Sequence, residues 1–170
     1  MKKIKLLQYI INLIFFVSIF SLFKTIAKVI QYFYNISNKN PFEINRVELP
    51  QNDYTTKSVL LFSIISAILM IYFLNLLNKL INHFLNNEIF SEKIILLLNK
   101  IGITLLVSSL TKGMPMGTYY IYLCTNNKLE HTKSPFSYHI PEIILALFFL
   151  VLGEVFKIAK GLKEENELTV

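Results

Sequence analysis

The sequence predicts an all-α membrane protein with four transmembrane helices in an antiparallel bundle and a small extracellular β element. Hydrophobic residues make up 54% of the 170 residues, and a mean hydropathy of +0.51 is too high for one soluble domain. Four apolar runs approach the roughly 20 residues that a helix needs to cross a bilayer. We expect one membrane domain over residues 1–170, with spans near 4–23, 59–78, 94–111 and 141–160, and a charged cytoplasmic tail over 161–170.

The last apolar run carries the clearest helix signals. Pro141 opens it, where proline costs the helix no hydrogen bond, and Glu142 suits the positive helix start. Lys157 and Lys160 suit the negative helix end, and Gly161 is a typical C-terminal cap. The sequence therefore predicts a span that ends at Gly161 and continues into the tail.

The first run follows three lysines and resembles a secretory signal, but no small-x-small cleavage site comes after it, so we expect an uncleaved span. A polar stripe then recurs every three or four residues, at Ser21, Lys24 or Thr25, Lys28, Gln31 and Asn35. This pattern predicts that the helix continues to residues 35–41. The stripe is either a partner surface or a partly solvated helix end with snorkelling lysines.

The second run is preceded by a loop and followed by an amphipathic segment. Residues 42–49 alternate between apolar and polar, which predicts one short strand. After residue 74 the polar residues occupy one face of a continuing helix: Asn75, Asn78, Lys79, Asn82, His83 and Asn86.

The third run begins at Ser91, a candidate N-cap, followed by Glu92. Its hydroxyl and amide side chains, together with Gly102, predict an inward-facing helix that another backbone approaches closely. Residues 111–117 contain Pro115 and are expected to break this helix. Residues 118–123 then indicate a strand or an interfacial aromatic belt, with 129–132 completing a hairpin outside the membrane.

Basic residues decide the expected topology. Arg46 is the only arginine among the 17 basic residues. A cytoplasmic N-terminus places nine of the 17 inside and eight outside, but the inside segments are shorter and therefore denser in lysine. We expect a multi-pass protein of the cell membrane with both termini cytoplasmic.

No motif in the sequence indicates enzymatic chemistry. Cys124, His131 and His139 are spaced by seven residues each and lack a fourth ligand, so ordinary loop residues are favoured over a zinc site. We expect no catalytic residue, no metal and no cofactor. The dispersed lysines fit lipid headgroups rather than direct binding of nucleic acid.

Two sets of residues are candidate sites. Glu154 and Lys100 have similar predicted depths and form a candidate intramembrane pair; the alternative is that each reaches the headgroups alone, with Lys157 as the local partner of Glu154. The last residues, Leu168, Thr169 and Val170, form a candidate interaction tail that suits a carboxylate-binding groove, or a frayed end.

Residues 90–102, 150–157 and the ending Leu162-Lys163-Glu164-Glu165-Asn166-Glu167-Leu168-Thr169-Val170 resemble a known family. The chain is similar, over nearly its whole length, to the small bacterial four-span membrane proteins called domain of unknown function 2975. The resemblance implies a bacterial membrane location and, frequently, a neighbouring gene for a helix-turn-helix regulator. It implies no established activity and no functional residues.

These observations leave three function classes. The first is a regulatory or interaction protein whose cytoplasmic helix ends and tail engage a partner such as a helix-turn-helix regulator. The second is a small transporter or channel subunit whose path is lined by Asn99, Lys100, Thr104, Ser108 and Glu154. The third is an assembly or stability factor. All three are compatible with a homo-oligomer in the bilayer.

Overall fold

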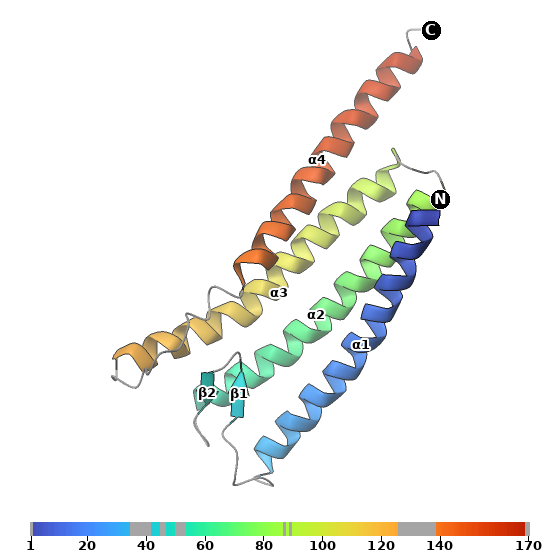
Figure 1. Cartoon of the computed structure of the whole chain (residues 1–170). Helices are drawn as coiled ribbons and strands as arrows, with labels where there is room; N and C mark the ends of the chain where they lie inside the picture. Colours follow the sequence, from blue (N-terminus) through green and yellow to red (C-terminus); the bar gives the residue numbers. More distant parts are fainter. Residues whose placement is uncertain are drawn as a thin grey trace.

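A computed structural model describes residues 2–34, 42–44, 47–49, 54–86, 88, 90–125 and 139–168. Four helices contain most of them: α1 (Lys2–Phe33), α2 (Tyr54–Leu85), α3 (Glu92–Thr125) and α4 (Ile140–Leu168). Consecutive helices run in opposite directions (Figure 1). With 29 to 34 residues each, the helices are longer than the predicted spans. The prediction that the first two helices continue beyond their apolar runs is confirmed.

The alternating directions give the molecule two distinct ends. At one end α1 begins, α2 ends, α3 begins and α4 ends; we call it the tail end (Figure 1). The other end, where α1 ends and α2 begins, also holds a two-stranded antiparallel sheet of β1 (Phe42–Ile44) and β2 (Val47–Leu49), and we call it the hairpin end (Figure 1). The first loop thus contains two short strands where the sequence indicated one.

The helices pack in chain order: α2 packs against α1 and α3, and α3 against α2 and α4. As a result α3 is the most enclosed, with 44% of its most apolar 18-residue stretch buried, against 6% for α1. The prediction that the third helix faces inward is confirmed. α1 contributes only two buried residues, Ile11 and Val29.

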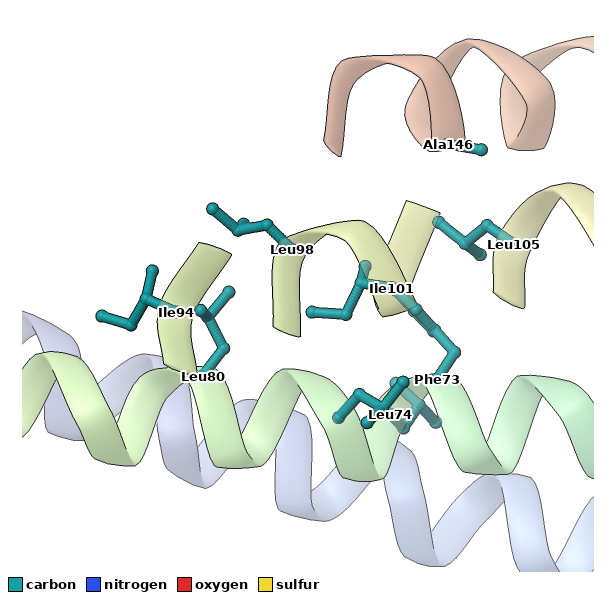
Figure 2. Packing of buried hydrophobic residues seen from close by; sticks show 9 residues of the cluster. Phe73, Leu74, Leu80, Ile94, Leu98, Ile101, Leu105 and Ala146 are labelled. Carbon is teal, nitrogen blue, oxygen red and sulfur yellow. The ribbon is translucent and has the colours of Figure 1, made fainter. Parts of the chain in front are cut away.

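The hydrophobic core lies where α2, α3 and α4 meet. Figure 2 shows side chains of α2 and α3 packed together, with Ala146 of α4 next to α3. Its members are Phe73, Leu74, Leu76, Leu80, Ile94, Leu98, Ile101, Leu105 and Ala146. Because lipid tails are as apolar as these side chains, close van der Waals packing rather than escape from water holds such a core together.

Two glycines allow α3 and α4 to approach closely. A Cβ added at Gly102 would lie 2.6 Å from Cγ of Leu150 and 2.9 Å from the carbonyl oxygen of Ala146. A Cβ at Gly153 would lie 2.5 Å from Oδ1 of Asn99. The close approach predicted at Gly102 is therefore confirmed, and Gly153 extends it along α4.

Three of the described helices, α1, α2 and α3, contain a stretch long and apolar enough to cross a membrane. α4 differs because every 18-residue stretch within it holds at least three charged residues, drawn from Glu142, Glu154, Lys157 and Lys160. Length and composition alone thus support three spans, and only the packing of α4 against α3 bears on a fourth.

The predicted break at residues 111–117 is wrong, because α3 continues through Pro115 to Thr125. Of the two alternatives for residues 118–123, the strand is therefore excluded because these residues are helical, and the partner segment 129–132 lies outside the described residues. Proline removes one backbone hydrogen bond, the one to the carbonyl four residues before it, but its φ angle is compatible with a helix. Met116 and Tyr119 are buried, so packing favours the continuous helix.

The predicted helix end at Gly161 is also wrong, because α4 runs on to Leu168. Lys160 pairs with Glu164 at 3.4 Å and Lys163 with Glu167 at 3.6 Å, each four residues apart. Such pairs stabilise a helix, and the residues after Gly161 are mostly good helix formers. Together they continue the helix through the glycine. Most of the predicted tail is therefore helical.

Candidate functional site

A cavity of about 410 Å³ lies in the half of the molecule towards the hairpin end, and residues of all four helices line it. We call it the hydroxyl pocket because six of its lining residues are serine or threonine. Its lining consists of Ser18, Ser21, Leu22, Thr25 and Lys28 of α1, Ser63, Ser66, Ala67 and Met70 of α2, Ser108 and Lys112 of α3, and Glu142 of α4.

Helical periodicity explains how α1 supplies its side of the pocket. Ser18, Ser21, Thr25 and Lys28 are three or four residues apart, so they share one face of the helix. Ser21, Thr25 and Lys28 belong to the predicted polar stripe. These three residues line the pocket, with Thr25 half-buried and Ser21 and Lys28 exposed.

The hydroxyls of α2 and α3 meet at the floor of the pocket. Ser66 and Ser108 are buried, and their hydroxyl oxygens lie 3.1 Å apart. Two other hydroxyls donate to their own helices: Thr25 to the Ser21 carbonyl at 3.0 Å and Ser63 to the Leu60 carbonyl at 2.7 Å. Their oxygens keep lone pairs that can accept a hydrogen bond from a ligand.

Three charged residues line the pocket: Lys28, Lys112 and Glu142. Glu142 lies 3.9 Å from Nδ1 of His139, the residue before α4. Within the described part of the chain, neither lysine takes part in an ion pair. The pocket lining thus carries two positive charges against one negative charge.

His139 is buried beside this charged group, with a relative exposure of 4%. It packs on Gly113, where an added Cβ would lie 3.4 Å from its ring. Burial first, and then the positive charge of Lys112, lower the pKa of His139 below 6.5, although Glu142 opposes the shift. Neither ring nitrogen has a hydrogen-bond partner among the described residues. The imidazole is therefore neutral at pH 7.

Of the two alternatives considered for Glu154, the local partner Lys157 lies within reach. Glu154 lies 3.8 Å from Lys157 of its own helix, which is the local alternative, and its side chain is 63% exposed. Gly153 faces Asn99 across the α3–α4 contact. One residue further along a helix turns the side chain by about 100°, so Glu154 and Lys100 point away from that contact. The ion pair between the two helices joins Lys160 to Glu92 instead, at 2.9 Å.

The polar face of α2 is partly covered by α1. Asn78 donates a hydrogen bond to Asn12 at 2.8 Å, and Gln8 donates one to Asn82 at 2.7 Å. These amide pairs hold the two helices together at the tail end. His83 pairs with Glu88 at 2.7 Å. Part of the surface expected to meet a partner is therefore used inside the molecule.

The end of α4 projects beyond the other helices (Figure 1). We call residues 161–168 the α4 extension. It contains one lysine and three glutamates, hence a net charge of −2. Leu168 of the candidate tail is 86% exposed at its end. Thr169 and Val170 lie outside the described residues.

The residues weighed as a zinc site do not form one cluster in the described chain. Cys124 is exposed near the end of α3, His139 is buried before α4, and His131 lies outside the described residues. In the same described ranges, no three His, Cys, Asp or Glu side chains gather as metal ligands.

The sequence analysis did not identify the hydroxyl pocket. Hydroxyl residues inside three apolar runs were the available signal, since Ser18 interrupts the first run, Ser63 and Ser66 the second, and Ser108 the third. Which of them face one another depends on the rotation of each helix about its axis.

Comparison with known proteins yields one match. The model of the family described as "Protein of unknown function (DUF2975)" matches residues 39–170. The match covers β1 to α4 and begins after α1, so it is shorter than the nearly full-length resemblance expected. No curated protein and no solved structure matches the chain. Since the match spans well over half of the chain, the protein belongs to the DUF2975 family.

Proposed function

We propose that this protein is a non-enzymatic, four-span protein of the bacterial cell membrane that binds a cytoplasmic partner through the α4 extension. The observation that carries the proposal is the projection of α4 as a helix beyond the ends of its neighbours (Figure 1). A charged helix end outside the packed helices contributes little to the fold. It is therefore available for an interaction.

Packing supports a fourth span. α4 lies along α3, one of the three membrane-capable helices, with Ala146 and Gly153 in the contact. A helix in close contact with a span over this length lies at the same membrane depth. Glu154 and Lys157, 63% and 68% exposed, are near enough to the tail end to reach headgroups by snorkelling. Four spans then place both termini on one side, which the lysine distribution predicts to be the cytoplasm.

Charge supports a basic partner. The α4 extension has a net charge of −2, with Glu164, Glu165 and Glu167 on it. Proteins that bind DNA present a basic surface, and the family resemblance implies a helix-turn-helix regulator as a genetic neighbour. Intrahelical pairs, Lys160 with Glu164 and Lys163 with Glu167, hold the extension helical before binding, which lowers the entropic cost of association.

Copurification tests this proposal. The full chain, extracted from membranes in a mild detergent, is expected to retain the regulator encoded beside it at low salt and to lose it as the salt concentration rises. Replacing Glu164, Glu165 and Glu167 together by glutamine should abolish retention. Glu154→Gln is the matched control, because that glutamate is exposed on the same helix before the extension. Equal retention by all three proteins would contradict the proposal, as would a periplasmic location of a reporter fused after Val170.

The transporter or channel alternative receives less support from the described residues. Thr104 donates to the Lys100 carbonyl at 2.7 Å, and Glu154 faces away from α3. Of the groups considered for a path, Ser108 lines the hydroxyl pocket. These groups do not line a common route.

A further inference from the structure

The charges of the hydroxyl pocket are not balanced by the protein. Lys28 reaches the pocket from α1 and Lys112 from α3, whereas Glu142 of α4 supplies the one carboxylate in the lining. The described chain offers neither lysine an ion pair, and the neighbouring His139 is buried and neutral. Lys28 is exposed and Lys112 is half-buried, and a charge within a helical membrane protein is costly unless it is paired or reaches water. The lining therefore favours a ligand with one negative charge.

Hydroxyl groups near the lysines add hydrogen-bonding capacity. Ser18 and Ser21 line the pocket, and neither hydroxyl forms a hydrogen bond with another described residue. Ammonium and hydroxyl groups both donate to phosphate oxygens, and lysine is a common phosphate ligand. The carboxylate of Glu142 can only accept, so the same ligand needs a hydroxyl donor on the side that meets Glu142.

We propose that the hydroxyl pocket binds a phosphodiester monoanion that carries a hydroxyl group, such as the phosphoglycerol headgroup. The phosphate lies between Lys28 and Lys112, and the glycerol hydroxyl donates to Glu142. Leu22 and Met70 supply apolar lining for the carbon chain attached to the phosphate. The volume of about 410 Å³ is within the range of small-molecule sites, roughly 300 to 1,000 Å³. Basic pockets between membrane helices bind anionic headgroups for the same electrostatic reason.

Two sources supply this chemistry, a phospholipid and a soluble glycerophosphodiester. The full chain, purified in neutral detergent, is heated with short-chain phosphatidylglycerol, with its deacylated headgroup, or with phosphatidylcholine of the same chain length. Phosphatidylglycerol should raise the Tm saturably and phosphatidylcholine should not, because its headgroup carries no hydroxyl and has no net charge. An equal effect of the deacylated headgroup identifies a soluble ligand, and a much weaker effect identifies the lipid.

Variants show whether the effect comes from this pocket. Lys28→Met and Lys112→Met should each raise the half-saturating concentration of phosphatidylglycerol at least tenfold. Lys24→Met is the matched control, one helical turn before Lys28 but outside the pocket lining. An equal response to both lipids, or the same half-saturating concentration in all variants, would overturn the proposal.

A gain of binding provides a test that does not depend on losing a side chain's contribution to the fold. Glu142→Gln removes the negative charge from the lining, so the variant should bind inorganic phosphate more tightly than the unmodified protein does. No increase in phosphate binding by Glu142→Gln, measured by native mass spectrometry, would also contradict the assignment. This site lies towards the hairpin end, so the result of each test of the pocket is independent of whether the α4 extension binds the proposed partner.

Discussion

Alanine at three glycines separates the contribution of helix packing from that of helix propensity. Gly102 lies in the α3–α4 contact, where an added Cβ meets the Ala146 carbonyl oxygen at 2.9 Å, whereas nothing lies within 4 Å of a Cβ at Gly161. A backbone carbonyl cannot rotate away as a side chain can. Alanine at position 102 therefore forces α3 and α4 apart, and alanine at position 161 meets no atom.

The expected magnitude follows from two opposing effects. Alanine is more favourable than glycine in a helix interior by about 1 kcal/mol, and both substitutions gain this stabilisation. Overpacking of a tight contact costs about 1 to 3 kcal/mol, and only Gly102→Ala pays it. The helix-propensity gain cancels in the comparison, so Gly102→Ala should be less stable than Gly161→Ala by about 1 to 3 kcal/mol. The stability of Gly153→Ala should lie between those of the other two variants. The added Cβ first meets Oδ1 of Asn99, which is at the end of a side chain that can rotate.

Unfolding by SDS in mixed micelles measures these differences. The chain contains nine tyrosines and no tryptophan, so near-ultraviolet circular dichroism of tyrosine follows the loss of tertiary packing. Gly161→Ala should be as stable as the unmodified protein or more stable. If Gly102→Ala matched Gly161→Ala within error, the close approach of α3 and α4 would not be present in the folded protein, and the reasoning from the Cβ distances would fail.

Two further predictions concern charged groups at opposite ends of the molecule. In a double-mutant cycle, the effects of Glu92→Gln and Lys160→Met on the free energy of unfolding should be coupled at low salt and independent at high salt. The effects of Glu154→Gln and Lys100→Met should be additive. The reverse result would favour the intramembrane pair of Glu154 and Lys100. Because burial lowers the pKa of His139 in the folded protein, the unfolded chain binds more protons below about pH 6.5, so the Tm should fall as the pH decreases below that value. His139→Gln should reduce this fall, and an unchanged pH profile would argue against a buried, neutral ring.

The sequence by itself determined that there are four long helices and that α3 is the enclosed one. Both follow from one-dimensional patterns, because the length of an apolar run sets the length of a span and small or polar residues within it mark contact with other helices. Gly102 was predicted to allow a close approach for the same reason, and it does so. The resemblance in the last helix and tail was likewise sufficient to identify the family.

Local breaking signals were less reliable, because packing and side-chain pairing compensated for them. Pro115 does not end α3, since Met116 and Tyr119 on the following turn are buried. Gly161 does not end α4, since ion pairs of Lys160 and Lys163 support the next turns. A proline or glycine destabilises a helix only locally, and the contacts of the tertiary structure decide whether this free-energy cost is offset.

Only the tertiary structure decided which polar side chains meet. Sequence position gives depth along a helix, but each residue turns the side chain by about 100°, so a small rotation of the helix moves a group from one neighbour to another. The contact of Gly153 with Asn99 directs Glu154 away from Lys100. The same packing brings Ser66 to Ser108 and gathers Lys28, Lys112 and Glu142 around one pocket. The physical reason is that helix rotation is set by the interlocking of small and large side chains on several helices at once, which no single run of residues contains.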